Sequence, residues 1–393
     1  MKITVREETT GRLSLIMLSH GLVHVFLTSL AVVLLLIRLE FRLSYTQIGL
    51  FTFALSIITA AASVPMGFMS ERVNRLRLIS SMFFLMAIPA SFLVVVRSLT
   101  LVLLLFSFLW LCLSAFHPTA QAYLSSRYPD RRGEIFGLYE VGASSGMIMA
   151  PLIAAWLVSI WGWKSVYGIY ALPAIFAALG IYKIAGEETF PRQKEKSRLG
   201  AEFLGGLKGI LTHRRLKFIY MAHGLYAIIF ATAALYLPIF MVDVHGFSVP
   251  QAAYMLTFFL LGGALGRVLG GKSSDRWARN RVMGLAFLLL VPFLILLSLA
   301  TGGVILIVLS FGAGLTSHMI LPVVTAFIGD NAQGEMGLTY GMQSLVGFGF
   351  GAISRLLAGV LADLWGISVI FWMLAGVSLV GVVCSFFLLE RNS

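Results

Sequence analysis

The chain has 393 residues, of which 59% are hydrophobic and only 12% are charged. A soluble globular domain carries about 25% charged residues, so this composition excludes a water-soluble protein of this size. The net charge is +12. Because the basic residues gather in short segments between apolar runs, this excess does not indicate nucleic-acid binding and instead fits attraction to anionic lipid headgroups.

The apolar runs are long enough to cross a bilayer core about 30 Å thick. They are continuous rather than alternating, which favours helices over a barrel. We therefore predict an all-α polytopic membrane protein, with a break between the fifth and sixth spans marked by Trp161-Gly162-Trp163. The predicted transmembrane helices, twelve in all, are residues 13–37, 47–69, 78–96, 100–124, 134–158, 163–185, 214–241, 250–271, 282–300, 303–327, 337–361 and 366–389.

The distribution of Lys and Arg predicts the orientation. If the N-terminus is cytoplasmic, the tails and the segments after even-numbered spans hold most of them. The opposite side holds only Arg38, Arg42, Arg97 and Lys164. We therefore expect a multi-pass protein of the cytoplasmic membrane with both termini in the cytoplasm. No cleaved signal is expected, because the first apolar run is too long for one.

The second half of the chain repeats the first. The polar segment 186–213 separates six predicted spans from six, which predicts N-terminal and C-terminal six-helix bundles at 1–185 and 214–393 joined by a cytoplasmic linker. Ser and Gln three residues apart open both the second and the eighth span. The repeat also includes a charged loop motif, which occurs twice at an offset of 204 positions. The first copy contains Gly67, Glu71, Arg72 and Arg75, and the second contains Gly271, Asp275, Arg276 and Arg279.

Twelve helices with this loop motif after the second and eighth resemble the major facilitator superfamily of secondary transporters, whose motif reads G-x-x-x-D-R-x-G-R-R/K. The resemblance implies two pseudo-symmetric six-helix bundles, alternating access, a small-molecule substrate and no cofactor. The two acids, Glu71 and Asp275, are predicted to face helix N-termini and close the cytoplasmic side. The alternative is that the loop arginines only enforce topology.

The fifth span carries a second pattern, from Gly137 through Gly146 to Pro151. It resembles the G-x8-G-x3-G-P-x2-G-G motif of superfamily exporters, with Ala at three of the glycines. That resemblance implies a gating helix and export, whereas ordinary packing of small residues is the alternative. Residues 114–152 further resemble the fosmidomycin-resistance branch, although Glu140 replaces its usual Gln.

Ionisable residues inside a membrane are costly and are expected to lie on the substrate or proton path. We predict such a path from a set of histidines, one acid and two arginines: His20, His24, His117, Glu140, His223, Arg267, His318 and Arg355. Four of these histidines fall at about one depth in the membrane and are expected to form a ring: His20, His117, His223 and His318. The alternative is that they only hydrogen-bond neighbouring helices. His20 and His24 have a metal-ligand spacing, but no acid or cysteine nearby in sequence completes a site, so no metal is predicted.

These patterns predict a monomeric secondary transporter that exports a drug-like or anionic compound, with protons as the coupling ion. Uptake or exchange of organic anions is the alternative. A channel and an intramembrane enzyme are disfavoured, because the chain is a tandem repeat with motif-bearing loops and contains no catalytic motif. No phosphate-binding loop is present, so ATP does not drive the cycle.

Overall fold

The computed structural model describes residues 2–70, 73–128, 132–187, 205, 208, 214–331 and 336–388. Within these ranges all regular elements are helical. In chain order they are α1 (Lys2–Phe41), α2 (Tyr45–Ser70), α3 (Arg75–Phe92), α4 (Leu99–Leu113), α5 (Phe116–Arg127), α6 (Arg132–Trp161), α7 (Trp163–Ile184), a 3-10 turn (Ala185–Glu187), α9 (Arg214–Asp243), α10 (Val249–Arg276), α11 (Arg279–Leu299), α12 (Gly303–Asn331), α13 (Met336–Trp365) and α14 (Val369–Phe386).

The described helices contain 12 segments long and apolar enough to span a membrane, as predicted. The predicted break between the fifth and sixth spans is confirmed, because α6 ends at Trp161 and α7 begins at Trp163. Gly162 between them has φ of 74°, a left-handed conformation that glycine adopts without steric cost. The predicted linker lies almost entirely outside the described residues.

One predicted span is not a single helix. Residues 100–124 were expected to be continuous, but α4 ends at Leu113 and α5 begins at Phe116, with the two forming one span. Pro118 explains the break, since it has no N–H to donate to the carbonyl of Ser114 and its ring clashes with that carbonyl. The break places His117 in the first turn of α5.

The repeated Ser and Gln form the same structure twice. The backbone N–H of Ser44 donates to the Gln47 side chain (2.9 Å), and the N–H of Gln47 donates to the Ser44 hydroxyl (3.2 Å). Ser248 and Gln251 form the same reciprocal capping box at the start of α10. The repeat seen in the sequence therefore includes a shared way of starting these two helices.

The chain divides into two compact units. Unit 1 comprises Met1–Val33 and Ile58–Ser197, and unit 2 comprises Leu34–Ile57 and Arg198–Ser393. Each of α1 and α2 therefore contributes to both units. The boundaries predicted at residues 185 and 214 remain predictions.

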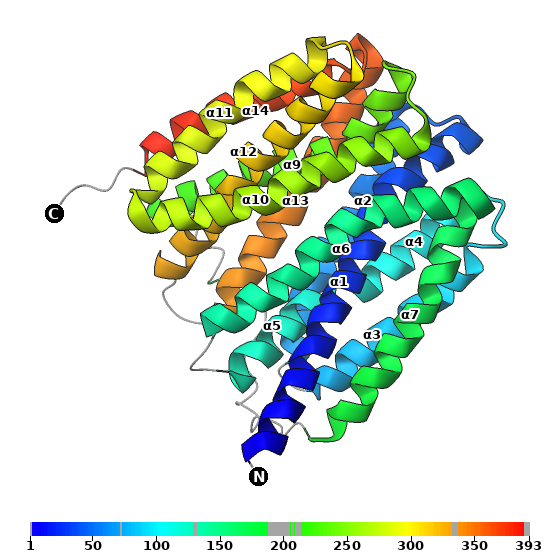
Figure 1. The fold of residues 1–393 in the computed structure, drawn as a ribbon, viewed down its shortest axis with the longest axis vertical. Helices are drawn as coiled ribbons and strands as arrows, with labels where there is room; N and C mark the ends of the chain where they lie inside the picture. Colours follow the sequence, from blue (N-terminus) through cyan, green and yellow to red (C-terminus); the bar gives the residue numbers. More distant parts are fainter. Residues whose placement is uncertain are drawn as a thin grey trace. The chain divides into compact units, whose positions relative to one another are not determined.

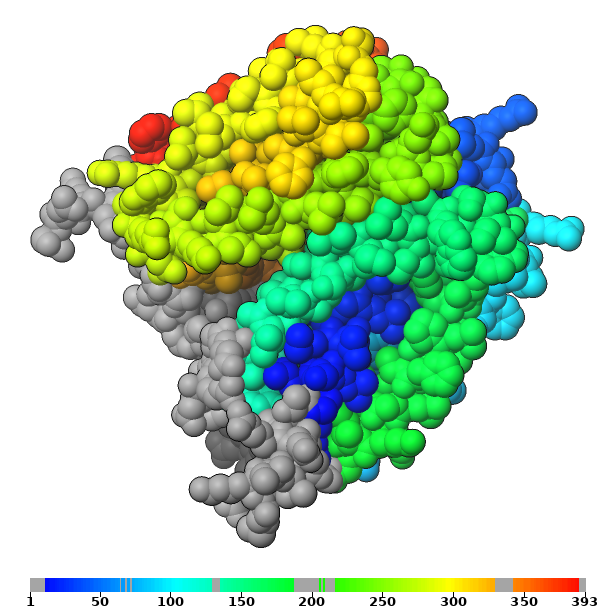
Figure 2. Space-filling view, in the orientation of Figure 1, coloured from blue at the N-terminus to red at the C-terminus, as the bar shows by residue number. Residues whose placement is uncertain are grey.

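In unit 1, α3 runs beside α7, and residues of α1 lie between α6 and α7 (Figures 1 and 2). Gly142 and Gly146 permit the close approach of α6 to α1. A Cβ at Gly146 would overlap the carbonyl of Gly21, and one at Gly142 would overlap the carbonyl of Met17. Small residues thus bring two membrane helices into backbone contact, as they commonly do in bilayers.

In unit 2, α10 packs against α12, α9 against α13, and α11 against α14 (Figure 1). The contact of α10 with α12 uses glycines one turn apart on α10. Added Cβ atoms at Gly262, Gly266 and Gly270 would meet the backbone of α12 at Phe311, Leu315 and Met319 respectively. The glycine-rich eighth span is therefore a packing surface.

Candidate functional site

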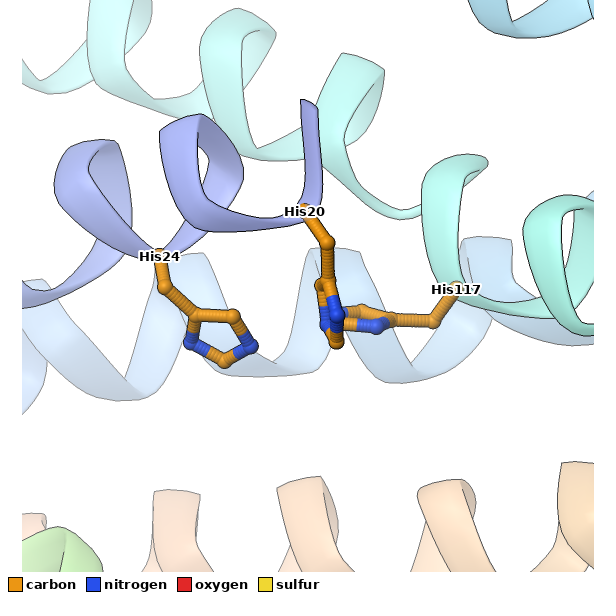
Figure 3. Close-up of side chains that lie close together, drawn as sticks. All are labelled: His20, His24 and His117. Carbon is orange, nitrogen blue, oxygen red and sulfur yellow. The ribbon is translucent and has the colours of Figure 1, made fainter. Parts of the chain in front are cut away.

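Three of the predicted path histidines meet in unit 1. His20 and His24 come from α1, one turn apart, and His117 comes from α5 (Figure 3). Ring centroids are 4.8 Å apart for His20 and His24, 5.2 Å for His20 and His117, and 5.5 Å for His24 and His117. We call His20, His24 and His117 the histidine cluster.

The cluster is oriented by Tyr139 of α6. The Nδ1 of His20 is 2.8 Å from the Tyr139 carbonyl oxygen, and the two rings stack with centroids 3.6 Å apart. Because a carbonyl only accepts, Nδ1 of His20 carries the proton and Nε2 has the lone pair. The Tyr139 hydroxyl also lies 3.4 Å from Nδ1 of His117. A single tyrosine therefore sets the positions of two of the three rings.

The other two predicted histidines lie in unit 2. Nδ1 of His318 on α12 donates to the Gly314 carbonyl at 3.0 Å. His223 on α9 packs beside Gly347, whose Cβ would meet its ring. The ring of Tyr226 lies between them, 6.2 Å from His223 and 6.0 Å from His318. The structure therefore groups the histidines by unit, and the complete ring remains a prediction.

Glu140, the one acid of the predicted path, was expected to be buried within the membrane, and this is wrong. The residue is exposed, whereas Tyr139 before it is fully buried. Successive residues of a helix point about 100° apart, so packing Tyr139 against α1 turns Glu140 away from that contact.

The two predicted arginines have different surroundings. Arg355 on α13 donates from Nη1 to the Ser56 hydroxyl at 2.6 Å and from Nε to the Ala231 carbonyl at 3.2 Å. Both acceptors are neutral, and the described residues contain no ion pair to this guanidinium. Arg267 on α10 is half-buried, and its helix packs against α12, which carries His318.

The first copy of the loop motif is partly visible. Glu71 and Arg72 lie outside the described residues. Arg75 donates to the Ser126 hydroxyl at 2.8 Å and to the Ser70 carbonyl at 3.2 Å, so it fastens the start of α3 to neighbouring helix ends. Asn74, which departs from the family motif, accepts from the N–H of Arg77 at 2.9 Å and caps α3.

In the second copy, Asp275 and Arg276 are exposed at the end of α10. The guanidinium of Arg279 lies 5.7 Å from the centre of the Phe327 ring. Gly271 has open space where a Cβ would be. The proposed contacts of Glu71 and Asp275 with helix N-termini therefore remain predictions.

The small-residue motif of the fifth span lies in α6, and its two ends have different surroundings. Gly146 and Ala150 are buried, and the Ala150 carbonyl accepts from Ser29 of α1 at 3.3 Å. Pro151 is also buried within α6. Gly137, by contrast, is exposed with open space around it. The part of the motif from Gly146 onward is thus the contact surface for α1.

Sequence reasoning missed a polar network in unit 2. Nη1 of Arg38 lies 2.7 Å from a carboxylate oxygen of Asp243, which also accepts from the Tyr45 hydroxyl at 2.6 Å. Asp363 accepts from the backbone N–H groups of Tyr45 (2.9 Å) and Thr46 (2.8 Å) at the start of α2. We call Arg38, Tyr45, Asp243 and Asp363 the outer network, because all four lie at span ends predicted to face outward.

A signal for this network was present in the sequence. Asp243 and Asp363 are acids at the ends of apolar spans, on the side where basic residues are scarce. Arg38 was considered only as a count in the charge distribution. Matching opposite charges at the same predicted depth would have paired Arg38 with one of these acids.

The chain is similar to known membrane transporters over nearly its full length. Residues 16–272 and 219–393 match the Major Facilitator Superfamily. The chain is 24% identical over 390 residues to the fosmidomycin resistance protein of Escherichia coli (strain K12), covering 96% of this chain and 92% of that protein. It is 25% identical over 356 residues to YfnC, an MFS-type transporter of Bacillus subtilis (strain 168), covering 87% of this chain and 84% of that one.

A solved structure shares the fold. A bacterial homologue of the human lysosomal transporter Spinster, in an inward-facing and unoccupied conformation, superposes with a TM-score of 0.75 at 20% identity, covering 96% of this chain and 94% of that chain. The all-helical architecture and the family expected from the loop motifs are thereby confirmed. With family matches in both halves and 12 candidate spans, the chain belongs to the Major Facilitator Superfamily and is a multi-pass membrane transporter, not an enzyme.

Proposed function

We propose that the chain exports a small drug-like or anionic organic compound across the cytoplasmic membrane in exchange for protons. The position of Glu140 carries the proposal for coupling. It is an exposed carboxyl within the membrane-spanning α6, directly after the packed Tyr139. A carboxyl inside a span is costly and marks a functional path. Because Glu140 lies outside the contact that Tyr139 makes with α1, protonating it does not require α6 and α1 to separate.

Export is supported by two features. The small residues of α6 from Gly146 onward occupy the register of the exporter motif and contact α1. A relative that matches nearly the whole chain is named for resistance to fosmidomycin, a property that expulsion of a compound would confer. We propose His223 and His318 as buried polar groups of the same path in unit 2.

Arg355 favours a substrate with a negative charge. Its bonds to Ser56 and Ala231 use two of its five N–H donors and leave the others for further acceptors. A half-buried guanidinium with neutral partners is stabilised by an incoming anion. This observation also supports the second candidate function, uptake or exchange of organic anions such as monocarboxylates.

We propose that the outer network holds the outward side closed in one state of the cycle. It joins the outer ends of α1 and α2 to α9 and α13 with one ion pair and three hydrogen bonds to carboxylates. The charged loops after α2 and α10 are the corresponding elements at the cytoplasmic side. The Arg38–Asp243 pair is partly exposed, with 17% and 19% of the two side chains accessible, so solvent screening keeps it weak enough to break in every cycle.

The experiment is transport in proteoliposomes with an imposed pH gradient. Labelled candidates, including fosmidomycin, monocarboxylates and neutral drugs, are first screened by counterflow. A substrate exchanged for protons accumulates when the interior is acidic, and one carried with protons accumulates when the exterior is acidic, whichever way the protein is inserted. Accumulation only with an acidic exterior would favour anion uptake, and accumulation under neither gradient would overturn proton coupling.

Variants at Glu140 test the residue itself. Glu140→Gln is expected to keep counterflow but to lose accumulation driven by the gradient, since the amide binds no proton. Glu140→Asp restores a carboxyl and is expected to restore part of the accumulation. Glu40→Gln removes an exposed carboxyl at the outer end of α1 and serves as the matched control. If Glu140→Gln still accumulates substrate with unchanged pH dependence, Glu140 does not carry the proton.

A further inference from the structure

We propose that the histidine cluster of unit 1 binds a divalent transition-metal ion of the Zn²⁺ class. His20, His24 and His117 each offer one ring nitrogen, and these nitrogens all lie within 4.8 Å of one another. Imidazole nitrogen is a common ligand of Zn²⁺, and sites of three histidines leave one position open. Figure 3 shows the His20 and His24 rings on the same side of α1, with His117 extending toward them from α5.

The local structure explains why three histidines converge inside an apolar span. His20 and His24 are at i and i+4, so they share one face of α1. His117 reaches that face because Pro118 interrupts the helix and α5 restarts at Phe116. Equal depth in the membrane predicts that His117 lies near His20, but only the fold brings its ring nitrogen within reach of both His20 and His24.

The surroundings fit the way metal-binding histidines are held. Such a histidine usually donates its other ring N–H to a carbonyl or carboxylate, which fixes the tautomer. His20 does this through Nδ1 to the Tyr139 carbonyl at 2.8 Å, so Nε2 is the ligand atom. The Tyr139 hydroxyl, 3.4 Å from Nδ1 of His117, favours Nε2 as the ligand of that ring too.

Binding requires a small rearrangement. Tetrahedral Zn²⁺ with bonds of about 2.0–2.1 Å holds its nitrogens about 3.3 Å apart. The present spacing is within 4.8 Å, so side-chain rotations that bring the nitrogens closer by up to about 1.5 Å complete the site. The bound ion would tie α1 to α5, with the fourth position taken by water or an anionic group.

The test uses the full chain, purified in detergent with an affinity tag that contains no histidine. Co²⁺, which absorbs visible light intensely when tetrahedral, is titrated with and without competing Zn²⁺. We expect one equivalent to bind, Zn²⁺ to displace it, and Zn²⁺ to raise the thermal unfolding midpoint. His24→Asn and His117→Asn are expected to weaken binding by about 100-fold or more, since each removes a ligand outright.

His245→Asn is the matched control, because His245 lies in the turn between α9 and α10, outside the cluster. It is expected to bind the ion as the wild type does. Melting curves measured without metal identify any variant that does not fold. If His24→Asn or His117→Asn fails to fold, His20→Asn replaces it as a ligand deletion. Absence of Co²⁺ and Zn²⁺ binding by the wild type, or equal binding by the folded His24 and His117 variants, would overturn the proposal.

Discussion

At the residue scale, Arg355 has both a structural and a proposed substrate role. Its guanidinium ties α13 to Ser56 of α2 and to Ala231 of α9. A single charged side chain in this position connects three helices of unit 2 and retains donors for an anion. Separating the two roles requires variants that change one and keep the other.

Arg355→Ala is expected to raise the KM for an anionic substrate by about 10-fold to 100-fold. This corresponds to losing a hydrogen bond between charged groups, which contributes about 1.5–3 kcal/mol. Arg355→Lys keeps the charge but loses the planar fork, so it is expected to recover only part of the affinity. Ser56→Ala, which removes one neutral acceptor, should leave KM nearly unchanged. Counterflow measures all three, and normal KM in Arg355→Ala would remove the argument for an anion.

Gly146 and Gly137 belong to one motif but differ in their surroundings. A Cβ at Gly146 overlaps the Gly21 carbonyl, whereas one at Gly137 meets open space. Gly146→Ala is therefore expected to destabilise the protein by about 1–3 kcal/mol through overpacking. Gly137→Ala should be neutral or slightly stabilising, because alanine favours helix. Thermal unfolding in detergent compares the two, and equal melting of both variants would contradict the packing role of Gly146.

At the scale of elements, the start of α2 depends on residues far away in sequence. Its first two backbone N–H groups, at Tyr45 and Thr46, donate to Asp363 of α13. A carboxylate at a helix N-terminus satisfies free donors and interacts favourably with the helix dipole. Asp363 thus adds to the capping box of Ser44 and Gln47, and opening the outer network costs the N–H groups of Tyr45 and Thr46 their acceptor.

Asp363→Asn is expected to weaken this contact by about 1 kcal/mol. If the outer network closes the outward side, labelling of a cysteine at Ser56 by a membrane-impermeant thiol reagent should then become about fivefold faster. Cys112 and Cys384 are replaced first, so that the introduced cysteine is the labelled one. Glu40→Gln is the control, because it removes an outer carboxyl that is not part of the outer network. Unchanged labelling in Asp363→Asn would show that the network does not close this side.

At the scale of the whole molecule, repeats and hydropathy predict the spans well because each span is decided locally, by length and apolar content. The capping boxes at Ser44 and Ser248 follow from sequence for the same reason. The histidine cluster could be predicted only in part. The i and i+4 spacing pairs His20 with His24, and equal depth brings His117 to their level, but neither gives the ring contacts of His117. The exposure of Glu140 could not be predicted, because it depends on which face of α6 packs against α1. Tyr139 occupies that face, and the sequence alone does not show this.

The orientation of the chain is a prediction for the whole molecule, resting on the scarcity of Lys and Arg in the segments after odd-numbered spans. With 12 spans both termini lie on one side, and the basic excess puts them in the cytoplasm. A reporter inserted at Gly302, in the turn between α11 and α12, should therefore be active outside, and one at Ala278, between α10 and α11, inside. Alkaline phosphatase, active only outside, and green fluorescent protein, fluorescent only inside, read the two positions independently. Both positions reporting the same side would contradict the span between them, and reversed signals would invert the outward assignment of Arg38, Tyr45, Asp243 and Asp363.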